Sequence, residues 1–191
     1  LPGSVGRRPL EPNPMPRRAV LSDEQRMALL ALPDDETTLV QHWTLSEDDL
    51  AIIVRRRRPH NRLGFAIQLC ALRYPGRLLR PGELIPDTPL AFVAEQLQIA
   101  PEVLADYATR GPTRYEQLDA LREGFGFTQF SRPLRAALQE WLLPIALTTT
   151  SGAGLARSLL GECRRRRIIV PGISSVERMV AQALLDAERH V

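Results

Sequence analysis

Residues 61–73 read Asn-Arg-Leu-Gly-Phe-Ala-Ile-Gln-Leu-Cys-Ala-Leu-Arg, and this stretch decides the fold. A helix drawn through it carries apolar side chains on nearly every face, and such a helix is buried on all sides. Asn61 is placed to act as its N-cap, and Tyr74-Pro75-Gly76 is a strong terminator. Gly64 would allow another segment to approach closely. The sequence therefore predicts a central buried helix over residues 62–73.

Helical periodicity continues over most of the remaining chain. Ser22 with Gln25 forms a capping box, and Ser46 precedes an acidic first turn that suits a helix N-terminus. Ser174 or Ser175 is placed to cap the last helix. Strand signals are nearly absent, because the best apolar run is too short to anchor a sheet. We expect an all-α protein.

The chain of 191 residues is long enough for two small helical domains. The Gly-Phe-Gly-Phe sequence at residues 124–127 is the best boundary. We expect a first domain over residues 15–127 and a second over residues 128–191, the second open to truncation at its end. Residues 1–14 carry no pattern, so we interpret them as a disordered leader or as residues foreign to the natural protein.

Composition excludes several classes of protein. Hydrophobic residues make up 44% of the chain, which supports a folded core. No apolar run approaches the roughly 20 residues that cross a bilayer, and no secretory signal is present. Cys70 and Cys163 lie in apolar helical patterns, so we expect buried free thiols in a bacterial cytoplasm. Metal-ligand spacing, a P-loop and a nucleophile elbow are absent, so we expect no cofactor and no catalytic residue.

Arginine provides all 25 basic residues, and lysine is absent. Eight of them form two runs: a first quartet of Arg55, Arg56, Arg57 and Arg58, and a second quartet of Arg164, Arg165, Arg166 and Arg167. The guanidinium group donates two parallel hydrogen bonds to phosphate or to a guanine edge. A GC-rich genome accounts for the missing lysine, and helix C-termini favour cations. Codon usage does not explain two runs of four, which predict one cationic surface for a polyanion.

Polar residues follow each quartet. His60, Asn61 and Arg62 come after the first, where the arginines would clamp phosphates and Asn61 or Arg62 would reach a base edge. Alternatively, the arginines coat a solvated face and Asn61 caps its helix; for Asn61 itself we favour the cap. Ser174, Ser175 and Arg178 follow the second quartet, where a helix N-terminus would supply amides and hydroxyls to a phosphate.

Residues 90–107 have the spacing of a helix-turn-helix, with a short turn before Pro101 at the start of a second helix. A DNA-reading unit and a purely structural helical hairpin both produce this pattern. If the unit reads DNA, the best candidate contacts lie just beyond the second helix. They are Arg110, Thr113 and Arg114.

Three stretches together resemble the N-terminal region of Tn3-family transposases. They are residues 21–26 (Leu-Ser-Asp-Glu-Gln-Arg), residues 43–50 (Trp-Thr-Leu-Ser-Glu-Asp-Asp-Leu) and residues 57–76, with Asn-Arg-Leu-Gly-Phe-Ala at 61–66 as the most specific part. Residues 165–178 resemble the second N-terminal module of that family. The resemblance covers residues 15–191.

The resemblance implies a helical region that binds the terminal inverted repeats of a transposon. In that family a large C-terminal region with an RNase H-like fold carries the DDE carboxylates, and this chain is too short to hold both. We therefore expect a non-catalytic part of a DDE transposase that binds double-stranded DNA sequence-specifically. The alternative is a helical module for protein interaction or self-association of the transposase. An RNA-binding module is less favoured, because aromatic residues are only 5% of the chain.

Overall fold

The computed structural model describes residues 20–107 and 111–190, with the backbone alone for residues 111–114. The predicted leader at residues 1–14 lies outside this range. The described part is all-α, as the sequence predicts, and apart from an isolated bridge between Thr128 and Ile168 it contains no β-structure. The helices are α1 (Asp23–Leu30), α2 (Glu36–Trp43), α3 (Glu47–Ile53), α4 (Pro59–Arg73), α5 (Asp87–Leu97), the 3-10 helix η1 (Pro101–Asp106), α6 (Gly111–Phe125), α7 (Arg132–Ala146), α8 (Gly152–Arg165) and α9 (Ile173–Arg189).

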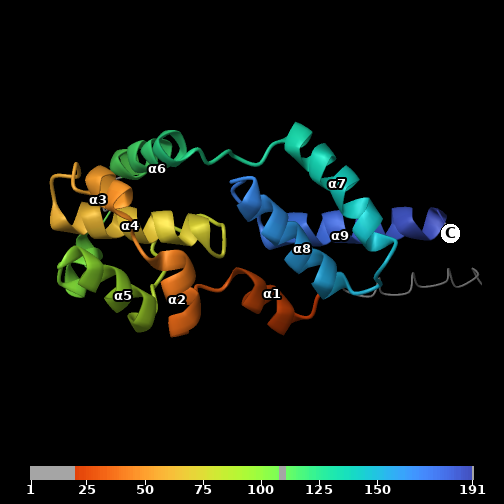
Figure 1. Ribbon diagram of the computed structural model, residues 1–191, viewed down its shortest axis with the longest axis horizontal. Helices are drawn as coiled ribbons and strands as arrows, with labels where there is room; N and C mark the ends of the chain where they lie inside the picture. The colour runs from red at the N-terminus through yellow and green to blue at the C-terminus, as the bar shows by residue number, and fades with distance from the viewer. Residues whose placement is uncertain (1–19, 108–110, 191) are drawn as a thin grey trace, which may run out of the picture.

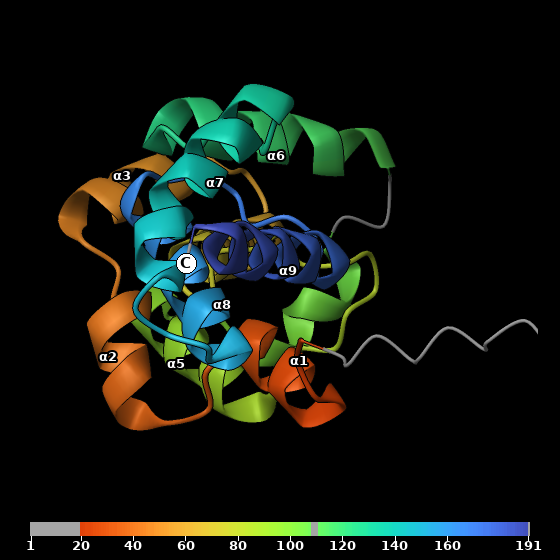
Figure 2. The same ribbon diagram turned by 90° about the vertical axis from the view of Figure 1, so that its right-hand side faces the viewer.

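These helices form two lobes that lie side by side along the long axis of the molecule (Figure 1). The first lobe contains α2 to α6 with η1, and the second contains α1 with α7, α8 and α9. Each lobe has its own cluster of buried apolar side chains. In the second lobe α9 packs against α7 and α8, while α1 packs against α8 (Figure 2).

Helix α4 is the centre of the first lobe. All ten residues from Leu63 to Leu72 are buried, as the apolar pattern around the whole helix predicts. Helices α2, α3, α5 and α6 and the 3-10 helix η1 all contact it. Burying apolar surface is the dominant favourable contribution to folding, so this helix organises the lobe.

Helix α1 lies in the second lobe, although it precedes the whole first lobe in sequence. Leu21 is 1% exposed within the second apolar cluster, and Leu29 and Leu30 pack against that cluster. Arg26 adds an ion pair to Glu177 of α9, with 2.7 Å between Nε and Oε1. The predicted first domain, residues 15–127, therefore includes a helix that packs with the other lobe. A short amphipathic helix does not encode which apolar surface covers it.

The helix caps agree with the sequence at two positions and differ at two. Capping boxes form at Ser22 and at Ser46, as predicted. The predicted cap at Asn61 is wrong, because α4 begins at Pro59 and Asn61 already lies inside the helix. The predicted cap at Ser174 or Ser175 is wrong, because α9 begins at Ile173 and both serines lie in its first turn. Proline suits the first turn of a helix, where its missing N–H is no loss.

The pattern does not predict α2, whose signal is nonetheless present in the sequence. Asp35 accepts a hydrogen bond from the backbone N–H of Thr38 at 2.9 Å and so caps the helix. Trp43, at its end, is completely buried and donates from Nε1 to the carbonyl oxygen of Tyr74 at 2.9 Å. An Asp followed by a Glu in the first turn is an ordinary start signal for a helix.

The predicted helix-turn-helix does not form its second α-helix. Helix α5 ends at Leu97, and Gln98 takes the left-handed conformation with φ 54°. The next segment, η1, is a 3-10 helix of only six residues. Val103 and Leu104 of η1 pack against the first apolar cluster, so this segment covers α4 instead of projecting from the surface. The structural hairpin is therefore the alternative that the fold favours.

The contact between Gly64 and Tyr107 provides a test of this packing. A Cβ atom added at Gly64 would overlap the ring of Tyr107, so the ring would have to move. We expect Gly64→Ala to lower the free energy of unfolding by about 1–3 kcal/mol, the range for overpacking a core. The measurement is chemical denaturation followed by circular dichroism.

Gly161→Ala in α8 is the matched control. There the nearest atom to the added Cβ is a guanidinium nitrogen of Arg164 at 3.9 Å, which is ordinary contact. A helical Gly→Ala change without overlap stabilises by about 0.5–1 kcal/mol. Equal effects of the two substitutions would contradict the tight packing at Gly64.

Candidate nucleic-acid interface

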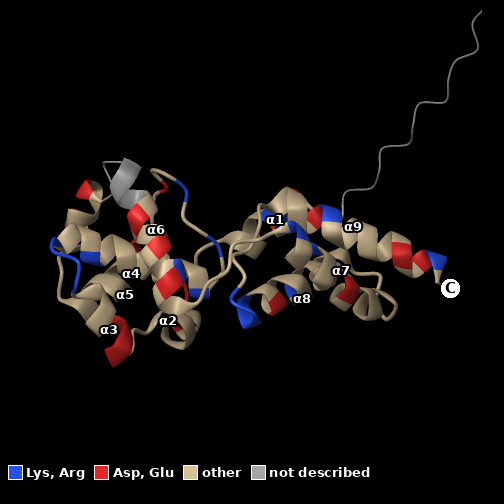
Figure 3. Ribbon diagram, turned by 90° about the horizontal axis from the view of Figure 1, so that it is seen from above, with Lys and Arg blue, Asp and Glu red and all other residues tan. Residues whose placement is uncertain are grey.

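The first quartet lies in the turn that joins α3 to α4, at the outer end of the first lobe (Figure 3). Arg55, Arg57 and Arg58 are exposed, and within the described part of the chain they form no ion pair. The four residues before the quartet are Ala, Ile, Ile and Val, so no carboxylate stands one helical turn away. Three guanidinium groups are therefore available to a ligand.

Arg56 differs from its three neighbours because its side chain is held against the protein. Its guanidinium carbon lies 4.4 Å from the centroid of the Phe65 ring, a cation–π contact. Its carbonyl oxygen accepts a hydrogen bond from Nε of Arg62 at 2.7 Å. These two contacts fix the turn to the start of α4, so Arg56 and Arg62 position the quartet.

A polar recess lies between the first quartet and α6. Its volume is about 390 Å³, and the residues that line it are Arg55, Arg56, Arg57, Arg58, Asn61, Glu116 and Gln117. His60 and Asn61 lie half-buried in the first turn of α4. Gln117 is buried at 3% exposure, and no sequence motif indicated it. Asn61 and Gln117 are 56 positions apart in the sequence, so no local pattern could reveal this pairing.

The second quartet makes contacts to the protein itself. The guanidinium carbon of Arg164 lies 5.0 Å from the centroid of the Tyr74 ring, and its Nη1 donates to the carbonyl oxygen of Pro75 at 3.3 Å. Burial lowers the pKa of Arg164. The Nη1 of Arg167 donates to the carbonyl oxygen of Phe125 at 2.8 Å. Two of the four arginines thus join α8 to the first lobe.

Glu162 engages the two remaining arginines of the second quartet. Arg165 and Arg166 each approach Oε1 of Glu162 at 2.6 Å, and the carboxylate is 6% exposed. The hydrogen bond from Arg165, followed by that from Arg166, lowers the pKa of Glu162 to about 2 against the opposing effect of burial. The sequence carried the signal, because Glu162 stands three and four residues before these arginines on one helix.

The two quartets do not form one contiguous cluster of charge, and the single cationic surface expected for both stays a prediction. Arg58 precedes α4, whereas Arg164 contacts Tyr74 directly after it. A helix of 15 residues is about 22 Å long, so the quartets lie at opposite ends of it. Figure 3 shows the same separation, with one basic segment at the outer end of the first lobe and the other at the end of α8. Of the two quartets, only the first forms no ion pair with a described residue.

The lobes meet at Tyr74-Pro75-Gly76, the predicted terminator of the central helix. The Tyr74 ring stacks on His42 with 4.8 Å between centroids, and Arg164 packs on the same ring. The carbonyl oxygen of Gly76 accepts a hydrogen bond from the backbone N–H of Val170 at 2.8 Å. The sequence predicts that the helix ends at this place. The structure shows that the same three residues also contact the second lobe.

The remaining predicted site residues fall into two groups. Arg178 is exposed and donates to its own helix, from Nε to the carbonyl oxygen of Ser174 at 3.2 Å and from Nη2 to Oγ of Ser175 at 3.1 Å. Arg110 lies outside the described residues, as do the side chains of Thr113 and Arg114. Binding of DNA by all these residues stays a prediction.

Comparison with known proteins shows which family the chain belongs to. A family model described as "Domain of unknown function (DUF4158)" matches residues 20–183. The chain belongs to the DUF4158 family. It is also 42% identical over 177 residues to the transposase for transposon Tn21 of Escherichia coli, an alignment that covers 93% of this chain and 18% of the relative.

Two further relatives carry the same description. The transposase for transposon Tn3926 of Escherichia coli is 42% identical over 179 residues, and that for transposon Tn501 of Pseudomonas aeruginosa is 38% identical over 177 residues. Each alignment covers 93% of this chain and 18% of the relative. The predicted resemblance to Tn3-family transposases is confirmed. This DUF4158 chain spans about 18% of the length of the curated relatives it matches.

The other ionisable groups of this DUF4158 chain form no metal-binding cluster in the part that the structure describes. Both cysteines are free and buried, as predicted, and burial raises the thiol pKa to about 12 for Cys70 and about 11 for Cys163. Within the described ranges, residues 20–107 and 111–190, no helix is long and apolar enough to cross a membrane. The first quartet with its recess is therefore the strongest candidate site.

The Glu162 cluster predicts a pH-dependent stability. Because the folded-state pKa of about 2 lies below the usual 4.5, the ionised carboxylate stabilises the fold above pH 4.5. This stabilisation is lost as the pH falls from about 4.5 towards 2. Glu162→Gln should lower the free energy of unfolding by roughly 1–3 kcal/mol at pH 7, the range for charged hydrogen bonds. Urea denaturation across this pH range measures the difference.

Glu140→Gln is the matched control, because Glu140 is exposed on α7 and forms no ion pair with any described residue. It should leave stability unchanged at each pH. A difference between wild type and Glu162→Gln that stays constant from pH 7 to pH 2.5 would rule out the pairing.

Proposed function

We propose that this chain is the DNA-binding, non-catalytic N-terminal part of a Tn3-family transposase, acting in the bacterial cytoplasm. Its ligand would be the double-stranded terminal inverted repeats of a transposon. The observation that carries the proposal is the first quartet. It presents three exposed guanidinium groups without ion pairs among the described residues, in a turn anchored by Arg56 and Arg62.

The chemistry of this turn suits a phosphate backbone. An exposed, unpaired guanidinium can donate two parallel hydrogen bonds to one phosphate, and it stays charged at any physiological pH. Releasing counterions from DNA then drives binding. The second quartet is less suited, because Arg165 and Arg166 already share a carboxylate and Arg164 packs on Tyr74. Phosphate contact there would compete with protein contacts.

The name of each relative supports the assignment to transposition. Each is a transposase, and the chain aligns with about 18% of it. We infer that cleavage and strand transfer belong to the part of such a protein outside this chain. Several acidic residues here have structural roles: Asp35 caps α2, Asp49 completes the capping box of Ser46, and Glu162 pairs with arginines.

A DNA titration tests the proposal. We expect the chain to bind a transposon-end duplex more tightly than a scrambled duplex. Replacing Arg55, Arg57 and Arg58 together by Ala should weaken binding to both duplexes by the same factor, because phosphate contacts carry no sequence information. The slope of log affinity against log salt should fall by about 0.9 for each phosphate that the variant no longer neutralises. Fluorescence anisotropy over a salt series measures both quantities.

A charge-matched variant controls for the reduced net charge. Arg132, Arg135 and Arg157 are exposed arginines of the second lobe, and their joint replacement by Ala removes the same charge. It should affect affinity less than the quartet variant does. Equal effects would show that net charge, not the quartet, drives binding. Equal affinity of the wild type for both duplexes would refute the sequence-specific part.

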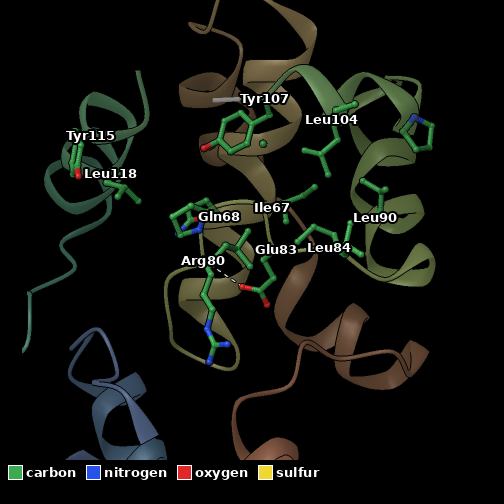
Figure 4. A pocket seen from close by; sticks show the side chains of 17 residues that line it. Ile67, Gln68, Arg80, Glu83, Leu84, Leu90, Leu104, Tyr107, Tyr115 and Leu118 are labelled. Atoms are coloured by element: carbon green, nitrogen blue, oxygen red, sulfur yellow. Dashed lines mark hydrogen bonds between the residues drawn. The ribbon is translucent and has the colours of Figure 1, made fainter. Parts of the chain in front are cut away.

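A second candidate function, a helical interaction module, is favoured by an apolar groove of the first lobe. The groove has a volume of about 810 Å³ and lies between α4, η1, α6 and residues 79–85. Ile67, Leu90 and Leu104 line it, with Gln68 among them (Figure 4). At its edge Leu84 is 91% exposed and Tyr115 is 71% exposed. Exposed apolar surface of this kind often marks a protein contact.

Self-association through this groove would be independent of DNA. We expect a dimer in light scattering that persists at high salt, since apolar contacts are not screened. Leu84→Asp should then shift the protein to the monomer. Leu147→Asp, at an exposed leucine of the second lobe, is the control that should leave the dimer intact. A monomer at every concentration would remove this candidate.

A further inference from the structure

Two residues that line the recess between the first quartet and α6 each have a buried polar atom without a hydrogen-bond partner among the described residues. Nε of Arg56 and Oε1 of Gln117 are both buried, and neither forms a hydrogen bond to any described residue. Both residues line the recess. One atom is a donor and the other an acceptor. Because buried polar groups are nearly always satisfied, a ligand of matching chemistry is expected here.

The two orphaned atoms distinguish between the parts of a nucleotide. A phosphate offers acceptors only, so it could satisfy Arg56 but would leave Gln117 unpaired. The Watson–Crick edge of a nucleobase carries a donor next to an acceptor and could satisfy both. The interior therefore suits a base better than a phosphate.

The size and rigidity of the recess agree with this ligand. Its volume of about 390 Å³ lies at the lower end of small-ligand pockets, roughly 300–1,000 Å³, and is too small for a helix. The donor is held in place, because the Arg56 guanidinium lies over the Phe65 ring. Gln117 is 3% exposed on α6, so it is also fixed. The exposed Arg55, Arg57 and Arg58 surround this space and can hold the phosphate of the same nucleotide.

We propose that this recess binds one unpaired, unstacked nucleobase through Arg56 and Gln117, with its phosphate on the exposed arginines of the first quartet. The proposal rests on the proposed DNA-binding function and adds that a base leaves the duplex. Bases of a duplex lie inside the stack, so only a flipped or unpaired nucleotide could enter. Within this site Gln117 is the residue that distinguishes a base from bare backbone.

The test compares two duplexes that differ only in one base. The first carries a single unpaired adenine, and the second carries an abasic sugar at the same position, which keeps the phosphate. We expect the wild-type chain to bind the first about tenfold more tightly, which corresponds to about 1.4 kcal/mol. With 2-aminopurine as the unpaired base, its fluorescence should change on binding, because the signal reports stacking.

Gln117→Leu removes the acceptor and should abolish the tenfold preference while leaving affinity for the abasic duplex unchanged. Thermal melting should show no decrease in stability, because replacing an unsatisfied buried amide by an apolar side chain is not costly. Gln117→Met serves as a second variant of similar volume. Gln129→Leu, at an exposed glutamine between the lobes, is the matched control and should keep the preference.

The outcomes separate the two proposals. Equal wild-type affinity for the unpaired adenine and the abasic duplex would overturn the base site and leave the phosphate-binding quartet standing. A preference that survives both Gln117→Leu and Gln117→Met would also overturn it, because the base would be read elsewhere. Failure to bind either duplex would refute the proposed function and this inference together.

Discussion

The burial of α4 on every side is the constraint on which the rest of the structure depends. From Leu63 to Leu72 no residue is exposed, so five neighbouring helical segments must pack around this one helix. A helix enclosed in this way can offer only its two ends to other partners. Its N-terminal end carries the first quartet into solvent, and its C-terminal end carries Tyr74-Pro75-Gly76 to the second lobe.

Two runs of four arginines with the same sequence acquire different roles. In the second quartet, Arg165 and Arg166 stand three and four residues after Glu162 and pair with its carboxylate, while Arg164 reaches the Tyr74 ring. The first quartet follows four apolar residues, so no acid on the preceding helical turn pairs with it. The same charge therefore stabilises the junction in one place and stays available to a polyanion in the other. Counting arginines cannot separate these roles, whereas the spacing to the nearest carboxylate can.

Patterns with a local cause were predicted well. The apolar helix α4 and the capping boxes at Ser22 and Ser46 depend on residues three or four positions apart, and all three form. The second helix of the predicted helix-turn-helix did not form, because η1 packs over α4 and its conformation follows that packing. At the candidate site, the first quartet was found from the sequence. Gln117 was not, since it reaches the recess from α6, far along the chain.

The sequence by itself determined the all-α class, the buried helix, the family resemblance and the clustering of arginine. These properties are read from composition and short spacings, which the unfolded chain already has. Only the tertiary structure decided that α1 joins the second lobe and that the quartets lie at opposite ends of α4. It also decided that Arg56 and Gln117 share one recess. Such pairings depend on which apolar surfaces cover one another, and that choice is made by the whole core rather than by any short segment.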